Sequence, residues 1–220
     1  MNLKVNYAHR TNYNLGRTKP ISYIVIHFTA NDGDTDEGNG KYFSQPNRGA
    51  SAHYFVDDDS VTLSVEEKNT AWHCGATKYK HKYCRNNNSI GVEMCSKKDN
   101  DDKYYIDELT VQNTANWVKK LMLKYNIPID NVLRHYDITG KNCPEPFVRD
   151  EKQWDRFKRV LEGKEMEVIR YNNIEEIPEW GKTTIKYLIQ KGCFADVNKL
   201  NLTEDMLRTF VINDRAGLYK

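Results

Sequence analysis

Ile21-Ser-Tyr-Ile-Val-Ile-His27-Phe28 places a histidine at the end of an apolar run of β-branched and aromatic side chains. Such residues favour a pleated surface, so we predict a buried strand over Ser22–Phe28. A second stretch, His135-Tyr-Asp-Ile-Thr-Gly-Lys-Asn-Cys143, sets a histidine and a cysteine eight positions apart on a glycine-containing loop. Two imidazoles and one thiolate are ligands that zinc accepts, with a fourth position left for water. We therefore predict a catalytic zinc site at His27, His135 and Cys143, provided that the three side chains meet in space.

Either histidine alone would more often be an ordinary hydrogen-bonded polar residue, and only the combination with the cysteine favours a metal.

The amino-acid composition argues against several other classes of protein. At 220 residues the chain can form one medium domain and a small one. Its formal net charge of +2 gives no indication of a nucleic-acid partner. Five cysteines, an odd number without framework spacing, are typical of reduced thiols.

Hydropathy argues against a membrane partner. The mean hydropathy is −0.80, and no apolar stretch approaches the roughly 20 residues that span a bilayer. The first residues lack the apolar core of a signal peptide. We therefore expect a protein that is synthesised in the cytoplasm without a signal peptide.

Further along the chain, short strands alternate with helices. Two strands flank a polar turn at residues 57–60, and a later strand contains Gly91, which would permit close backbone approach. Two amphipathic helices follow, the first with Thr110 as its cap. This alternation predicts an α/β domain with a central mixed β-sheet flanked by helices. The expected strands are Ala52–Val56, Val61–Val65 and Ile90–Cys95, and the expected helices are Thr110–Asn126 and Asp150–Leu161.

A short charged stretch, Gly163–Glu167, indicates a domain boundary. We expect a catalytic domain over residues 1–163 and a small, mainly helical C-terminal module over residues 168–220. In the module, Pro178 and Glu179 suit the start of one helix, and Thr203-Glu-Asp opens another. About 55 residues form a module of marginal stability on its own.

Five blocks of sequence occur in a characteristic order: Val25-Ile-His-Phe-Thr-Ala30, Ser51-Ala-His-Tyr-Phe-Val56, Ala71-Trp-His-Cys-Gly75, Ser89-Ile-Gly-Val-Glu-Met94 and the stretch from His135 to Pro144. In this order they resemble the zinc-dependent N-acetylmuramoyl-L-alanine amidases of the phage-lysozyme and peptidoglycan-recognition type. The resemblance covers about residues 1–162. The sequence of these blocks is similar to endolysins of phages that infect clostridia and bacilli, and residues 200–219 resemble the tail of clostridial amidase endolysins.

The resemblance implies a role for each matching residue. His27, His135 and Cys143 would be the zinc ligands. Glu93 matches the acidic residue beside the metal-bound water, and Lys141 matches a catalytic lysine. The alternative for Glu93 is a buried carboxylate without a partner, which would be costly, so the functional role is favoured. The alternative for Lys141 is an ordinary solvated lysine in a polar turn.

Two further histidines match family positions near the substrate. His73 would orient the peptide, although a structural hydrogen bond fits nearly as well. His53 would lie near the metal, with a site role and a structural role equally open. The implied reaction is hydrolysis of the amide between N-acetylmuramic acid and L-alanine in bacterial peptidoglycan.

Two other functions stay open. A peptidoglycan-recognition module would bind without cutting, but relatives of that kind lack the cysteine that is present at Cys143. A recycling amidase would act on soluble muropeptides. The extra module favours an insoluble wall as the target, because a second weak site raises effective concentration on a polymer; its alternative is a packing or dimerisation appendage. We expect a phage or prophage protein that acts on the cell wall after release, with its oligomeric state open.

Overall fold

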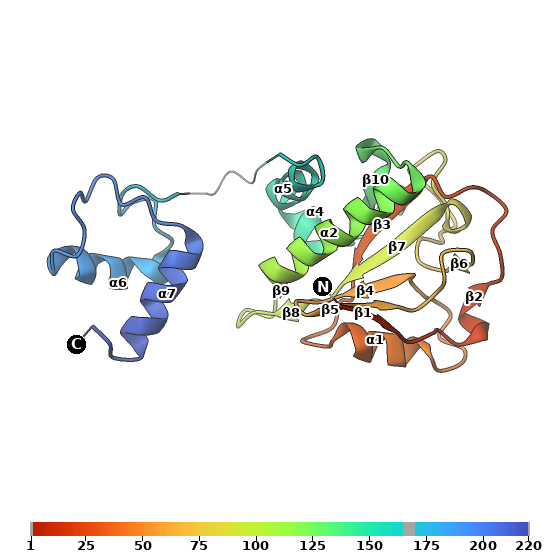
Figure 1. The fold of residues 1–220 in the computed structure, drawn as a ribbon, viewed down its shortest axis with the longest axis horizontal. Coiled ribbons are helices and arrows are strands. Elements are labelled where there is room, and N and C mark those ends of the chain that lie inside the picture. Colours follow the sequence, from red (N-terminus) through yellow and green to blue (C-terminus); the bar gives the residue numbers. More distant parts are fainter. Residues whose placement is uncertain (1, 165–169, 220) are drawn as a thin grey trace. The chain divides into compact units, whose positions relative to one another are not determined.

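The computed structural model describes residues 2–164 and 170–219, and the chain divides into two compact units, Met1–Glu165 and Met166–Lys220 (Figure 1). Part of the predicted boundary, residues 165–167, and the predicted start of the second domain at residue 168 lie outside the described residues. Each unit has its own apolar core.

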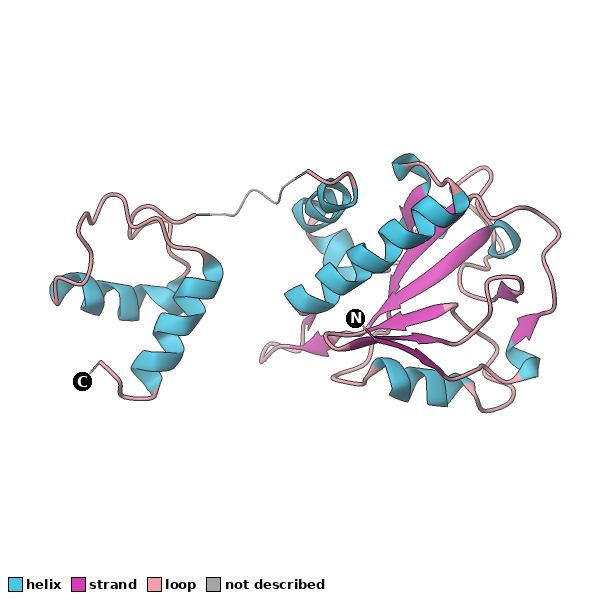
Figure 2. Ribbon diagram, viewed as in Figure 1, coloured by secondary structure: helices cyan, strands magenta, loops and turns pink. Residues whose placement is uncertain are grey.

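A six-stranded sheet forms the centre of the larger unit (Figure 2). All neighbouring strands run parallel except one antiparallel hairpin pair, β4 and β5. The predicted mixed sheet is therefore confirmed. In sheet order the strands are β1 (Asn2–Val5), β5 (Ser60–Leu63), β4 (Tyr54–Val56), β7 (Ser89–Met94), β3 (Tyr23–Phe28) and β10 (Val132–Arg134).

Alternating side chains give this sheet two different faces. On one face, apolar residues of β3 and β7 join the main core together with α2 (Glu108–Tyr125) and α5 (Glu151–Leu161). The buried members from the two strands are Ile24, Ile26, Ile90, Val92 and Met94. His27, Gly91 and Glu93 alternate with them and therefore belong to the opposite face.

The opposite face is covered in part by α1 (Asp36–Phe43), which packs on β4 and β5. A methyl group at Gly40 of α1 would lie 2.8 Å from Thr62 of β5, so this contact requires the glycine. Short elements complete the unit: β2 (Tyr13–Asn14), β6 (Thr70–Ala71), β8 (Lys97–Lys98), β9 (Tyr104–Tyr105), α3 (His135–Thr139), α4 (Glu145–Arg149) and 3-10 turns at Arg10–Asn12, Asn86–Asn88 and Ile129–Asn131.

The prediction of Thr110 as a helix cap is wrong. The helix begins at Glu108 after Asp107, and Thr110 is buried within its first turn. The carbonyl of Asp107 already accepts the backbone N–H of Val111, at 3.0 Å, so the helical bonds start three residues before the predicted cap. The helix predicted over Asp150–Leu161 is confirmed as α5, and the Asp150 side chain caps it by accepting the Lys152 N–H.

Between residues 170 and 219, the described part of the smaller unit, there are two helices, α6 (Glu179–Gln190) and α7 (Glu204–Arg215). The predicted helix start at Thr203 is confirmed, and the Thr203 side chain caps α7 by accepting the Met206 N–H. An isolated antiparallel bridge joins Tyr171 to Leu202. The buried core of this unit is Ile177, Ile185, Leu188, Leu200, Leu202 and Leu207. No helix among the described residues has the length and apolarity to cross a bilayer.

Candidate functional site

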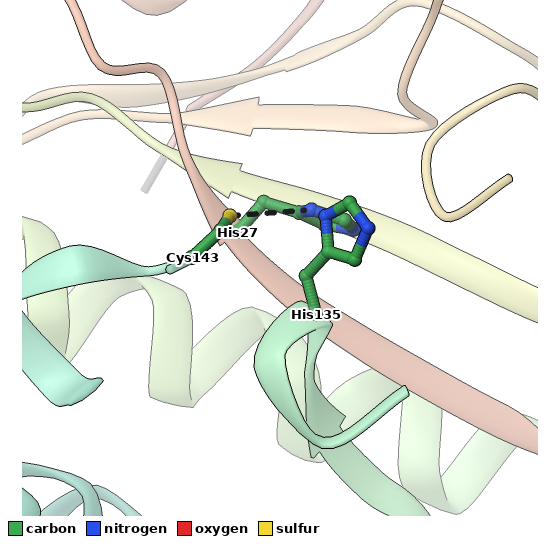
Figure 3. A group of neighbouring side chains, drawn as sticks. All are labelled: His27, His135 and Cys143. Atoms are coloured by element: carbon green, nitrogen blue, oxygen red, sulfur yellow. Dashed lines mark hydrogen bonds between the residues drawn. The ribbon is translucent and has the colours of Figure 1, made fainter. Parts of the chain in front are cut away.

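Three potential metal ligands meet in the larger unit (Figure 3). Donor atoms of His27, His135 and Cys143 all lie within 4.8 Å of one another. Cys143 Sγ is 3.6 Å from His27 Nδ1, and the three residues are 1%, 5% and 3% exposed. The structure thus meets the spatial condition on which the sequence prediction depended, and forms a possible His/His/Cys metal site.

The fold brings these residues together at the carboxyl ends of neighbouring parallel strands. His27 is near the end of β3 and pairs in register with Glu93 of β7. His135 begins α3 directly after β10, the strand on the other side of β3. The Cys143 carbonyl accepts the Tyr136 N–H at 2.9 Å, which ties the cysteine segment to α3. Crevices at the carboxyl ends of strands are the usual binding sites of open α/β sheets.

Arg134 connects the two segments that carry His135 and Cys143. Its guanidinium bonds both carboxylate oxygens of Asp137 on α3, the Phe147 carbonyl on α4, and Glu151 on α5. The residue is only 5% exposed. Arg134 therefore holds α4, which follows Cys143, against α3, which begins at His135.

A hydrogen-bond chain sets the tautomer of His27. The Ser89 hydroxyl donates to the Arg85 carbonyl at 2.7 Å, so its oxygen accepts from His73 Nε2 at 3.1 Å. His73 Nδ1 is then an acceptor, and the His27 Nε2–H donates a hydrogen bond to it at 3.0 Å. The remaining nitrogen, His27 Nδ1, carries a bare lone pair toward Cys143. An outer partner that fixes the ring in this way is typical of a metal-ligating histidine.

The protonation states of the three donors fit a metal. Burial, together with neighbouring histidines, holds the pKa of His27 well below its ordinary value, so the ring is neutral. Burial and the charge of Lys141 lower the pKa of His135 to about 4. Burial and Glu93 raise the pKa of Cys143 to about 12, so a cation would have to displace the thiol proton. His135 Nδ1 is buried with no hydrogen-bond partner, which is costly unless the atom binds something.

Glu93 lies next to the three donors. Its Oε1 is 3.9 Å from His27 Nδ1, and its Oε2 is buried without a hydrogen-bond partner. Burial raises the pKa of Glu93 to about 8, although Lys141 opposes the shift. A carboxyl group whose pKa is near the working pH is well placed to exchange protons. The sequence predicted this carboxylate at the site, and the structure places it there.

An open cleft of about 640 Å³ borders the site at His135. His73, His135 and Lys141 line it, together with Trp72 and Lys78. Lys141 is exposed, and its backbone carbonyl accepts the Cys143 N–H at 2.7 Å. The cleft thus places one predicted catalytic lysine and one predicted substrate-contacting histidine on a surface that a substrate can reach.

His53 differs from these residues because it is fully buried. Its Nδ1 accepts the Gly91 N–H at 3.0 Å, and its Nε2 lies 2.6 Å from Arg17. Its ring also contacts His73, with centroids 5.7 Å apart. His53 therefore supports the strand and histidine behind the site, and any effect on substrate would pass through them.

Sequence reasoning missed Ser89, Arg134 and Arg17. Ser89, Gly91 and Glu93 occupy every second position of β7 and therefore the same face of the sheet. This spacing is the one feature of the sequence that could have indicated a role for Ser89 at the site. The prediction that Gly91 permits close approach is confirmed: a methyl group there would lie 2.6 Å from His73 Cγ.

Comparison with known proteins identifies related sequences. Residues 17–146 match the sequence profile of the family described as N-acetylmuramoyl-L-alanine amidase. CwlL of Bacillus licheniformis is 34% identical over 172 residues, which are 73% of this chain and 45% of CwlL. BlyA of Bacillus subtilis (strain 168) is 35% identical over 157 residues, or 66% of this chain and 42% of BlyA. The chain thus spans less than half the length of these relatives.

Solved structures share the fold of the larger unit. The PlyG catalytic domain has a TM-score of 0.61 at 29% identity, covering 78% of this chain and all of that domain. The XlyA catalytic domain has a TM-score of 0.60 at 26% identity, covering 73% of this chain and 99% of that domain. The matched proteins thus have catalytic domains with the same arrangement of helices and strands.

Proposed function

Because this chain belongs to the N-acetylmuramoyl-L-alanine amidase family, we propose that it is a zinc-dependent peptidoglycan hydrolase. The bond cut is the amide between N-acetylmuramic acid and L-alanine. Bacterial peptidoglycan is the substrate, and the biological role is that of a bacteriolytic endolysin encoded by a phage or prophage. The clostridial part of the sequence resemblance stays a prediction.

One observation carries this proposal: three metal-type donors converge beside an unpartnered carboxylate, and one of the three, His135, lines an open cleft. His27, His135 and Cys143 would hold the ion. A zinc ion with three protein ligands supplies Lewis acidity and lowers the pKa of bound water to about 7. A module that only binds peptidoglycan would have no use for this arrangement.

The chain's own residues account for the proton movements. Glu93 accepts a proton from the attacking water at its unpartnered Oε2 and gives it to the nitrogen of the departing L-alanine as the C–N bond breaks. Lys141, exposed at the cleft, provides a positive charge for the oxyanion that develops on the scissile carbonyl. His73 holds His27 in one tautomer through its Nδ1, while its position in the cleft lining permits contact with the peptide. His53 holds β7 and the His73 ring in place.

We also propose that the smaller unit binds the cell wall. It contains no group of three metal-type residues among its described positions. Several apolar side chains on it are exposed, including Trp180 at 43% and Ile212 at 65%. A second weak site on the same chain would raise the effective concentration of the catalytic unit on an insoluble polymer.

Mass analysis of muropeptides tests the reaction. Digested walls should yield separate glycan chains and peptides with new L-alanine amino termini. A zinc chelator should abolish their release, and added zinc should restore it. Cys143→Ser, which keeps the side-chain shape but replaces the sulfur by a smaller oxygen, should bind zinc far more weakly. Products cut at a glycosidic bond, or full activity in chelator, would contradict the proposal.

A further inference from the structure

A second hollow of about 300 Å³ lies away from the metal-type residues, on the same face of the sheet. Its lining combines cationic, aromatic and amide side chains and includes no carboxylate. Lys19, Lys82 and Arg85 supply the positive charge, and Tyr23 and Tyr83 supply the rings.

The position of this hollow separates it from the catalytic cleft. Tyr23 begins β3, and His27 follows four residues later on the same strand face. At about 3.3 Å per residue, the two positions are roughly 13 Å apart. Tyr23 also packs against the buried Val25, Cys74 and Cys84 beneath it. The hollow and the cleft therefore have rigid strand structure between them.

The loop between β6 and β7 supplies two of the three cations of the hollow, Lys82 and Arg85. Residues 72–88 of this loop contain four lysines and arginines and no aspartate or glutamate, whereas the whole chain has a net charge of only +2. Lys19 and Lys82 are exposed and form no ion pair with any described residue. Lys82 Nζ lies 5.1 Å from the centre of the Tyr83 ring. Because no described carboxylate pairs with either lysine, an external anion can pair with them.

Arg85 is held in position before any ligand arrives. Its Nη1 donates to the carbonyls of His81 and Cys84, at 3.0 and 2.5 Å. Its guanidinium lies 3.7 Å from the centre of the Tyr79 ring. A guanidinium has five N–H donors, so donors remain after these bonds. An arginine fixed by carbonyls and an aromatic ring, with donors to spare, is an effective phosphate ligand.

We propose that this hollow binds a phosphodiester group of an anionic polymer attached to the cell wall. Lys19, Lys82 and Arg85 would neutralise the phosphate, and the exposed ring of Tyr83 would cover the adjoining polyol or sugar. The choice of a wall polymer rests on the proposed function, because that is the anionic polymer present where peptidoglycan is cut. The site would hold the enzyme along the polymer while the separate cleft engages the peptide.

Titration of the full chain with soluble poly(glycerol phosphate) tests this proposal. The variant Lys19→Gln/Lys82→Gln removes two cations, and Lys120→Gln/Lys152→Gln makes the same charge change at exposed positions elsewhere on the larger unit. For a flexible polyanion each phosphate contact changes the slope of log affinity against log salt by about 0.7. The slope should fall from about −2 in the parent to about −0.7 in the first variant, and affinity at 100 mM salt should drop roughly 10-fold. The control variant should bind like the parent.

Two results would overturn the proposal. One is equal binding of poly(glycerol phosphate) by the parent and Lys19→Gln/Lys82→Gln. The other is equally tight binding of a 20-nucleotide single-stranded DNA with the same sensitivity to that variant, which would indicate a general polyanion surface. Hydrolysis of a soluble muropeptide is measured in parallel and should be the same in all three proteins. Its absence in the parent would refute the amidase proposal while leaving the titration interpretable.

Discussion

Replacement of Arg134 by methionine should loosen the candidate metal site without touching any metal-type ligand. The buried guanidinium makes five hydrogen bonds that connect α3, α4 and α5. Methionine retains much of the apolar stem and removes all five donors. His135 begins α3, and Cys143 directly precedes Pro144, which caps α4. The relative placement of these two ligands would then depend on weaker contacts.

The expected size follows from the exposure of each partner. The buried Phe147 carbonyl loses its side-chain donor, which costs roughly 1–3 kcal/mol. The Asp137 side chain is 26% exposed and adds about 1 kcal/mol, whereas Glu151, at 61%, adds little because solvent screens it. The free energy of unfolding should therefore fall by about 2–4 kcal/mol. In a domain of this size that corresponds to a Tm lower by roughly 5–15 °C.

Calorimetry of the full chain, following the transition of the larger unit, measures this change. Arg156→Met is the matched control, because Arg156 also binds a carboxylate, Glu108, with both partners about half exposed. Its Tm should change by less than about 3 °C. Zinc affinity of Arg134→Met should fall about 10–100-fold, as for other groups that orient metal ligands. Equal Tm shifts in the two variants, or parent-like zinc affinity in Arg134→Met, would refute the reasoning.

Three further changes have definite expected outcomes. Glu93→Gln should retain zinc but lose turnover of soluble muropeptide by about 10²-fold or more, since it cannot exchange the proton; parent-like turnover would assign the base elsewhere. Gly91→Ala should lower zinc affinity about 10-fold by displacing His73, whereas Gly75→Ala, with its nearest neighbour at 3.5 Å, should not. Burial tends to raise the pKa of Glu67, but hydrogen bonds from Lys124 and two tyrosines outweigh it and lower the pKa. Its stabilisation should thus be complete above about pH 4.5 and lost as pH falls through the lower folded-state pKa. In urea unfolding, the stability difference between parent and Glu67→Gln should shrink in that acid range; a constant difference would contradict the assignment.

The sequence was sufficient to predict the mixed sheet, the two long helices of the larger unit and the three side chains that meet. Each prediction depended on local patterns: an apolar strand, a helical stripe, or ligand types on short segments. The register of His27 beside Glu93 was not predictable in the same way, because it depends on pairing between strands 66 residues apart.

Other elements carried too little local signal. Asn2–Val5 is largely exposed and becomes a strand through pairing with β5, far along the chain. Helix α1 contains two glycines, which weaken helix propensity, and is held by its Thr35 cap and close packing on Thr62. The contribution of Ser89 depends on a carbonyl and a histidine ring that only the folded chain brings to it.

The alternation along β7 has a consequence for how this protein can change. Val92 and Met94 belong to the core, while Gly91 and Glu93 between them serve the opposite face. Inserting one residue into β7 ahead of Gly91 would exchange the faces of these two pairs of residues. The Glu93 carboxylate would then point into the apolar core, and bulky apolar side chains would point toward the opposite face. Natural variation in chain length should therefore be absorbed by the loops, while the spacing inside this strand is kept.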